Sequence, residues 1–237
     1  MQIFHAPRIC GDTYALDETE SRHIIKALRM VAGDAVRLID GRGNLYEGII
    51  SSPDPRRCII QITATHESFE KTGYRLHIAI SPLKNVERFE WFIEKSVEIG
   101  IAEITPLICR RTEKQTVNTA RLERIVISAM KQSLKALAPT LNTPESFDSF
   151  MAVNREGVKM IAHCNEHVGS RLSIPQVCQR GADTTVLIGP EGDFTEDEIT
   201  AATLHGCIPV HLGRSRLRTE TAGIAACHSV YVINTAP

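Results

Sequence analysis

The chain has 237 residues, of which 43% are hydrophobic and 23% are charged, and its formal net charge is -1. These values fit a globular protein with a substantial core and exclude a strong overall positive field for nucleic-acid binding, although a local basic patch would suffice. The seven cysteines are scattered and include no CxxC pair, so a zinc ribbon or a thioredoxin-like motif is not indicated. The sequence shows no apolar leader and no run of membrane-spanning length, and we expect a reduced, cytoplasmic protein without a membrane partner.

The first part of the chain is predicted to be rich in β structure. Apolar or β-branched runs alternate there with Asp-Gly, Gly-Asn and Pro-Asp-Pro turns, and one segment has apolar residues at helical spacing. The elements expected are a helix at 17–30 and strands within 34–52 and 56–68. Short strands with one small helix indicate a compact barrel, which we assign to residues 1–70. A polar linker is expected at about residues 67–74.

Strands and helices are predicted to alternate in the remainder, residues 74–237. The expected strands lie within 74–83, 103–108, 158–164, 184–189 and 208–213. The expected helices lie within 85–100, 121–137, 196–206 and 221–233. Gly100 provides the stop signal of the first of these helices. Such alternation predicts an α/β domain with a mostly parallel sheet.

The first glycine-containing loop, "LIGPEGDFTEDEI", follows one of these strands directly. Thr195 with Glu198 forms a capping-box pair, which predicts that a helix begins near Glu196. Gly189 and Gly192 permit unusual backbone angles and close approach of a ligand, and ligands of α/β proteins bind at the carboxyl ends of parallel strands. A plain strand-to-helix turn is the alternative for this loop.

A second loop, "VHLGRSRLRTETAGIAA", also leaves a strand through a glycine, Gly213. Arg214, Arg216 and Arg218 follow at alternate positions. If the two strands are neighbours, the two loops line one crevice. Guanidinium groups suit bidentate phosphate contacts, so this loop indicates phosphate binding, with a solvated basic loop as the alternative.

Several familiar site motifs are missing from the sequence. There is no GxxxxGK[ST], no GxGxxG after a strand and no GxSxG, which argues against a P-loop, a dinucleotide Rossmann site and an α/β-hydrolase nucleophile. The nine histidines show no HExxH spacing, and His163 with Cys164 does not make a metal site, so no metal is expected. Most histidines are interpreted as packed or surface residues.

A basic segment extends from Arg110 to Lys135. It has seven Lys and Arg residues against two Glu residues, a local net charge of +5. The basic residues are Arg110, Arg111, Lys114, Arg121, Arg124, Lys131 and Lys135. Charge concentrated on a loop and one helix face suits a phosphate backbone, and a solvated helix face is the alternative.

Together, "IGPEGDF" and "LGRSRLRTETA" resemble the two C-terminal motifs of the SPOUT methyltransferase superfamily, and more narrowly those of the 16S ribosomal RNA uridine-N3 methyltransferase family. The resemblance extends over nearly the whole chain. "HIIKALRMVAGDAV" is similar to that family's N-terminal signature, "IEKSVEIGIAEITPL" to its Lys-x-x-Glu-x-Gly segment, and "AMKQSLKALAP" to its Ala-x-x-Gln-Ser helix. The Arg-Thr-Glu-Thr-Ala run is specific, whereas GPEG by itself is weak.

The resemblance implies a PUA-like, RNA-binding β-barrel at residues 1–70 and a trefoil-knotted α/β methyltransferase domain at residues 74–237. It implies a homodimer that uses S-adenosylmethionine to methylate N3 of a specific uridine in 16S ribosomal RNA, with the assembled small subunit as the expected substrate. The residues expected to hold the cofactor are Gly189, Pro190, Glu191, Gly192, Leu212, Gly213, Leu217 and Arg218.

The expected RNA surface combines basic residues from the whole chain. These residues are Arg22, Arg29, Arg110, Arg111, Arg124, Lys131, Lys135, Arg214 and Arg216. Three departures from the family pattern matter. Asp193 stands where the family usually has a Gly, Ser215-Arg216 stands where it has Arg-Ile or Arg-Val, and Lys131 and Lys135 replace a common Glu and Arg.

Methylation of N3 requires that uracil lose its N3 proton. An arginine near the base oxygens would stabilise the resulting anion, and Arg218 is the candidate catalytic residue. The sequence identifies no general base. Two alternatives stay open: a SPOUT methyltransferase for another RNA, such as a transfer-RNA ribose, and a non-catalytic RNA-binding assembly protein.

Overall fold

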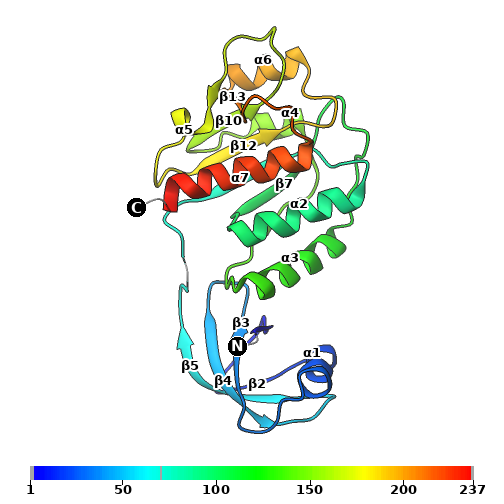
Figure 1. Ribbon diagram of the computed structural model, residues 1–237, viewed down its shortest axis with the longest axis vertical. Helices are drawn as coiled ribbons and strands as arrows, with labels where there is room; N and C mark the ends of the chain where they lie inside the picture. The colour runs from blue at the N-terminus through cyan, green and yellow to red at the C-terminus, as the bar shows by residue number, and fades with distance from the viewer. Residues whose placement is uncertain (1–2, 70, 236–237) are drawn as a thin grey trace. The chain divides into compact units, whose positions relative to one another are not determined.

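The computed structural model describes residues 3–69 and 71–235, and the chain divides into two compact units (Figure 1). Unit 1 comprises Met1–Lys71 and Ile127–Ala138, and unit 2 comprises Thr72–Val126 and Pro139–Pro237. A segment from the middle of the chain thus belongs to the N-terminal unit through tertiary packing, which no pattern in the sequence predicts. Within the described residues, no helix is long and apolar enough to cross a lipid bilayer.

Unit 1 is built on one five-stranded sheet in the order β1-β3-β4-β5-β2. Its strands are β1 (Ile3–His5), β2 (Thr13–Ala15), β3 (Ala35–Ile39), β4 (Leu45–Ser52) and β5 (Ile59–His66). The β1–β3 pair is parallel and the other pairs are antiparallel, with a register shift in β4 between Glu47 and Gly48. Alternate residues of these strands, with Phe4, Leu16 and Ile24, form a continuous apolar core.

The helix expected at residues 17–30 is shorter and irregular. An α-helix, α1 (Glu18–Arg22), continues as a π-helical turn, η1 (His23–Ala27). The Asp17 carboxylate caps the start by accepting a hydrogen bond of 2.8 Å from Glu20 N–H. The left-handed backbone of Arg29, with φ of 56°, lies just beyond the end. The apolar spacing predicted a helix here, but it did not predict the change from an α-helix to a π-helical turn.

Unit 2 contains a sheet of β11-β13-β10-β12-β6-β7-β8 in that order, with β9 paired to β7. Its strands are β6 (Leu76–Ile80), β7 (Glu103–Ile108), β8 (Thr140–Leu141), β9 (Glu145–Ser146), β10 (Val158–Ala162), β11 (Leu172–Ser173), β12 (Thr184–Ile188) and β13 (Ile208–His211). The described pairs of this unit are all parallel. The predicted parallel α/β arrangement is confirmed.

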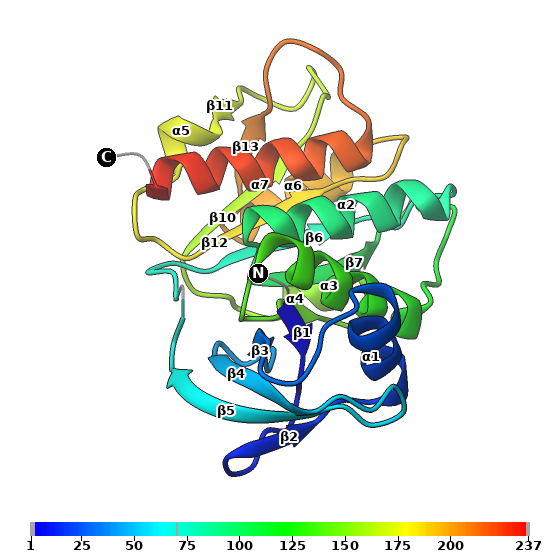
Figure 2. The ribbon, with the colours of Figure 1, turned by 60° about the horizontal axis from the view of Figure 1, so that its bottom comes forward.

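Helices cover both faces of this sheet, as Figure 2 shows. The helices of unit 2 are α2 (Val86–Ile99), α4 (Phe147–Ala152), α5 (Ile174–Val177), α6 (Glu196–Leu204) and α7 (Thr219–Thr235). Helix α3 (Thr119–Ser133) begins in unit 2 and ends in unit 1. Helices α2 and α7 pack side by side on one face, while α4 and α6 lie on the other. Since both faces are covered, the central strands β6 and β12 are buried along their whole length.

The local signals in the sequence place two helices accurately. Helix α2 has Asn85 as its N-cap and ends at Gly100, whose left-handed φ of 110° closes the helix. Helix α6 begins at Glu196, and the capping box between Thr195 and Glu198 is present. Both predictions are confirmed. Because these signals are contained in a few consecutive residues, they act without help from distant packing.

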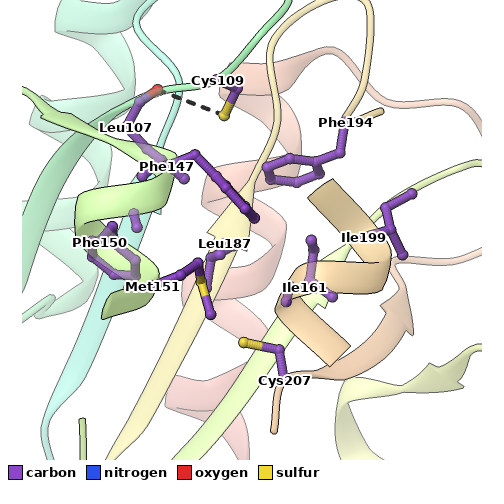
Figure 3. Packing of buried hydrophobic residues seen from close by; sticks show 12 residues of the cluster. Leu107, Cys109, Phe147, Phe150, Met151, Ile161, Leu187, Phe194, Ile199 and Cys207 are labelled. Atoms are coloured by element: carbon purple, nitrogen blue, oxygen red, sulfur yellow. Dashed lines mark hydrogen bonds between the residues drawn. The ribbon is translucent and has the colours of Figure 1, made fainter. Parts of the chain in front are cut away.

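The α4–α6 face carries a core cluster that anchors the first glycine-containing loop (Figure 3). Phe147 and Phe150 of α4 pack toward Leu187 of β12 and Ile161 of β10. Phe194, which follows the loop, is 1% exposed, and its ring centroid lies 6.1 Å from that of Phe147. Burying a phenylalanine contributes roughly 1.5–3 kcal/mol, so this side chain fixes the loop to the core.

Candidate functional site

A cavity of about 420 Å³ lies at the carboxyl edge of the unit 2 sheet. The loops after β10, β12 and β13 surround it. Its lining residues are Arg88, Ala162, His163, Cys164, Arg171, Ile188, Gly189, Pro190, Glu191, Asp193, His211, Leu212, Gly213, Ser215, Arg216, Leu217, Arg218, Thr219, Glu220 and Ala222. The cavity is therefore built where parallel α/β sheets generally bind their ligands.

The two predicted loops line this one cavity, although their strands are not neighbours. Strand β10 lies between β12 and β13 and pairs with both. The loops still meet because all three strands are parallel and end at the same edge. The two strands therefore do not need to be adjacent for their loops to meet. The intervening strand β10 adds Ala162, His163 and Cys164 to the cavity, which the sequence interpretation did not include.

The backbone of the loop after β12 differs from the expectation for its glycines. Neither Gly189 nor Gly192 has a left-handed conformation, whereas Asp193 does, with φ of 65°. Gly189 fits closely against the protein's own core, because a Cβ there would lie 3.0 Å from the ring of Phe194 and would force it to shift. Asp193 N–H donates 2.9 Å to the carbonyl of Pro190 and closes a tight turn. Gly192 is not among the residues that line the cavity.

Three segments distant in sequence hold this loop in place. Arg111 Nη1 donates 2.7 Å to the carbonyl oxygen of Gly192, and Lys84 N–H donates 3.4 Å to Glu191 Oε1. Asp193 Oδ2 accepts a hydrogen bond of 2.7 Å from the backbone N–H of Cys164. The loop therefore has contacts from the segments after β6, β7 and β10.

The loop after β13 supplies basic residues to the cavity. Gly213 has φ of 110°, a conformation that glycine adopts without strain, and its N–H donates 3.2 Å to His211 Nδ1. Arg216 and Arg218 line the cavity, but Arg214 does not. The predicted cofactor residues thus come together here, except for Gly192.

A buried acidic residue lines the same cavity as these arginines. Glu220, in the first turn of α7, is 6% exposed and lines the cavity. Its Oε1 lies 3.8 Å from Nε of Arg88, which is half exposed. A carboxylate near a helix N-terminus is favourably placed with respect to the helix dipole. The cavity therefore offers both signs of charge to a ligand.

His163 is one of the polar lining residues that the sequence interpretation missed, together with Arg88, Arg171 and Glu220. It follows β10, lines the cavity and is 4% exposed, yet neither of its ring nitrogens has a hydrogen-bond partner among the described residues. Burial is the main cause that lowers its pKa; the Asp193 carboxylate raises that pKa, Arg171 lowers it and the nearby Asn165 backbone raises it. A buried polar group without a partner is costly, and a bound ligand would remove that cost. The rule that residues following a parallel strand face a ligand would have singled out His163.

The predicted RNA-contacting residues are distributed over both units. In unit 2, Arg110 Nη1 lies 3.0 Å from Asp197 Oδ2, and the exposed Arg124 donates 3.3 Å to the carbonyl of Ala120. In unit 1, Lys131 Nζ is 2.5 Å from Glu20 Oε1.

The exposure of these basic residues differs. Arg22 is exposed and paired with Glu18, Arg29 is exposed, and Lys131 and Lys135 are half-buried. The structure does not bring these residues together at the cavity, apart from Arg216.

Comparison with known families assigns the class of protein. Residues 70–231 match the RNA methyltransferase domain, and residues 16–63 match the RNA methyltransferase PUA domain. The chain belongs to the RNA methyltransferase family. Its fold is the α/β fold of SPOUT-type methyltransferases with a PUA-like N-terminal domain, as predicted. The trefoil knot stays a prediction.

Individual proteins similar to this chain agree with that class. "Ribosomal RNA small subunit methyltransferase E" of Rickettsia conorii is 27% identical over 219 residues, which cover 90% of this chain and 87% of that protein. A "probable rRNA-methyltransferase" from Porphyromonas gingivalis is 39% identical, with a TM-score of 0.93 and coverage of 99% and 98%. A Legionella pneumophila protein solved with the bound cofactor SAM is 27% identical, with a TM-score of 0.86 and coverage of 98% and 97%.

Proposed function

We propose that this protein transfers the methyl group of S-adenosylmethionine to N3 of a uridine in 16S ribosomal RNA. The observation that carries the proposal is the cavity at the carboxyl edge of the unit 2 sheet, formed by both family-specific loops. The similar proteins named as small-subunit ribosomal RNA methyltransferases support this choice of RNA. The similar structure with bound SAM supports the choice of cofactor.

The residues present fit this cofactor. The cavity volume of about 420 Å³ lies within the range of ~300–1,000 Å³ that small-molecule sites occupy. S-adenosylmethionine carries a carboxylate, an ammonium and a sulfonium, so it needs partners of both signs, and the cavity has Arg88, Arg216 and Glu220. His163 offers an unpaired donor and acceptor to the uncharged adenosine.

Individual residues have distinct proposed roles in holding the cofactor. The walls of the cavity would be formed by the backbone of Gly189, Pro190, Leu212 and Gly213. Gly192 lies outside the cavity, and its carbonyl would help to hold the loop in place by accepting the hydrogen bond from Arg111. The remaining lining residues from the predicted set are Glu191, Leu217 and Arg218. When bound, S-adenosylmethionine supplies an electrophilic methyl group on a cationic sulfur.

The chain's own contribution to the chemistry is orientation and charge. Arg218 is exposed at the rim of the cavity, where a base entering from solvent would meet its guanidinium. A positive group close to the uracil oxygens favours loss of the N3 proton to water and stabilises the resulting anion. Holding base and methyl donor in one cavity makes the reaction effectively unimolecular. We therefore assign Arg218 as the catalytic residue.

The RNA would be held by further basic residues and by unit 1. The PUA match supports residues 1–70 as an RNA-binding domain. Arg110, Arg111 and Arg124 are exposed and would contact phosphates. We also propose a homodimer that acts on the small subunit in the cytoplasm, on the basis of the family resemblance. Light scattering of the purified protein measures the oligomeric state directly.

Mass spectrometry of 16S ribosomal RNA tests the function. RNA or small subunits from cells lacking this protein would be incubated with the purified protein and S-adenosylmethionine, and then digested to nucleosides. We expect 3-methyluridine to appear, identified by co-elution with a standard. Appearance of 2′-O-methyluridine would indicate a ribose methyltransferase, and absence of any methylated product with free RNA and subunits would contradict the proposal.

A further inference from the structure

We propose that Asp193 is a positioning residue, which clasps the loop after β12 to the loop after β10 and so holds the cavity in the shape that its ligand requires. The inference rests on the proposed binding of S-adenosylmethionine in this cavity. Asp193 belongs to the sequence motif "IGPEGDF", at a position where the family resemblance leads us to expect a glycine. The structure gives this departure a physical role.

Each oxygen of the Asp193 carboxylate accepts a hydrogen bond from a backbone N–H group. Its Oδ2 accepts 2.7 Å from Cys164 N–H, and its Oδ1 accepts 2.8 Å from Phe194 N–H. Hydrogen bonds to an ionised carboxylate are roughly twice as strong as bonds between neutral groups. One side chain therefore joins the end of β10 to the residue that anchors the first loop in the core.

The backbone at Asp193 indicates that the carboxylate matters there. Its φ of 65° is left-handed, a conformation in which glycine has no strain and other residues are uncommon. A glycine would satisfy this turn more easily. The chain has an aspartate instead, whose carboxylate accepts the hydrogen bond from Cys164. A glycine could not make that bond.

The loop after β10 is tied to β13 by His163 N–H, which donates 3.3 Å to the carbonyl of Val210, and its other bonds to the α6 side are weak. Asn165 Nδ2 donates 3.3 Å to Glu196 Oε1, between exposed groups. Arg171 Nη1 donates 2.8 Å to the carbonyl of His163, but that bond lies within the loop itself. The bond from Cys164 to Asp193 is therefore the shorter and stronger of the two links to the α6 side.

The position of His163 explains how the hydrogen bond between Asp193 and Cys164 affects ligand binding. It precedes Cys164 directly and lines the cavity with an unpaired imidazole. His163 N–H donates 3.3 Å to the carbonyl of Val210 in β13, and the Asp193 carboxylate holds the next residue, Cys164. The backbone N–H of the same Asp193 closes the turn that presents Pro190 and Glu191. Preorganised binding groups raise affinity because less ordering is lost on association.

Three substitutions at Asp193 separate the clasp from backbone strain. Asp193→Gly removes the clasp and relieves strain, Asp193→Ala removes the clasp and keeps the strain, and Asp193→Asn keeps an acceptor for Cys164 N–H. The readouts are hydrogen exchange of the Cys164 amide without ligand and the Kd of S-adenosylmethionine by calorimetry.

We expect Asp193→Gly and Asp193→Ala to speed Cys164 exchange and to raise the Kd by about ten-fold, the loss of one charge-assisted bond. Asp193→Asn keeps an acceptor for Cys164 N–H but loses the one for Phe194 N–H, so it should restore part of both. Asp197→Ala is the matched control, since Asp197 is an exposed carboxylate nearby that pairs with Arg110 and does not line the cavity. It should change neither readout.

Two results would overturn the inference: unchanged Cys164 exchange in Asp193→Gly, or a Kd within two-fold of wild type in both variants that lack the clasp. A wild-type protein that binds no S-adenosylmethionine would contradict the proposed function instead. Because amide exchange is measured without ligand, the two failures are distinguishable.

Discussion

Gly189 and Phe194 are in direct contact where the cavity loop joins the core of unit 2. A Cβ at Gly189 would lie 3.0 Å from Phe194 Cδ2 and 3.1 Å from the Phe194 backbone nitrogen. The glycine that opens the loop and the phenylalanine that closes it are therefore fitted to each other. The shape of the cavity wall depends on this internal packing as well as on any ligand.

Gly189→Ala is expected to destabilise the protein by about 1–3 kcal/mol, because the added methyl must displace a ring and a backbone atom in a packed core. Thermal denaturation and calorimetry with S-adenosylmethionine measure the two effects, and the Kd should rise as well. Gly73→Ala is the control, since a Cβ there meets nothing within 4 Å. Equal stability of the two variants would contradict the packing argument.

Phe194→Ala should cost more, about 3–5 kcal/mol, because a fully buried ring leaves a cavity between α4 and α6. Chemical denaturation measures the loss. Phe194→Leu should recover much of it by filling most of the volume. If Phe194→Ala changed stability by less than about 1 kcal/mol, the loop would not be anchored in the core as described.

Arg218→Ala is expected to lower kcat by at least about a hundred-fold while the protein stays folded, because stabilisation of the uracil anion is lost. Methylation of 16S ribosomal RNA measures turnover, and circular dichroism checks the fold. Arg180→Ala, at an exposed arginine outside the cavity, is the control. Wild-type turnover in Arg218→Ala would show that another residue stabilises the base.

Arg124→Glu should weaken binding to ribosomal RNA and reduce its dependence on salt, since one phosphate contact is replaced by repulsion. The effect of Lys131→Glu with Lys135→Glu is expected to include a loss of stability, because Lys131 pairs with Glu20 at 2.5 Å. Filter binding at several salt concentrations measures the RNA affinity of each variant and its dependence on salt. If all these variants bound RNA as the wild type does, the RNA surface would lie elsewhere.

Stability should fall with acid because of a buried histidine. Burial lowers the pKa of His77 to about 4, although Glu103 at 3.8 Å opposes the shift. The unfolded chain, with the ordinary value near 6.5, then binds the proton first, so the free energy of unfolding decreases as pH drops from about 6.5 to about 4. The loss is up to about 3 kcal/mol.

The measurement is urea unfolding of wild type and His77→Asn across this pH window. The variant should show a shallower decrease with acid, although His5 and His163, whose pKa values are also lowered, leave a residual slope. Parallel pH profiles for the two proteins would exclude His77 as the source.

Local order in this protein was predictable where a few consecutive residues suffice. The Thr195–Glu198 capping box starts α6 and Gly100 ends α2, because each signal satisfies backbone groups within one turn. The alternation of strand and helix predicted the parallel sheet. The glycine exits at Gly189 and Gly213 predicted which loops form the cavity, since the carboxyl ends of parallel strands share one edge.

Other features depend on contacts between distant parts of the chain. No local pattern encodes the insertion of β10 between β12 and β13, which brings His163 into the cavity. None predicts that Ile127–Ala138 packs with unit 1. The π-helical turn at His23–Ala27 likewise has the apolar spacing of an ordinary helix.

The sequence by itself determined the secondary structure signals, the two cavity loops and the resemblance to a methyltransferase family, because these depend on short runs of residues. The tertiary structure decided which strand lies between the loops and what the Asp193 carboxylate binds. Strand order and the partner of a single carboxylate result from packing between segments far apart in the chain, for which no periodicity carries information.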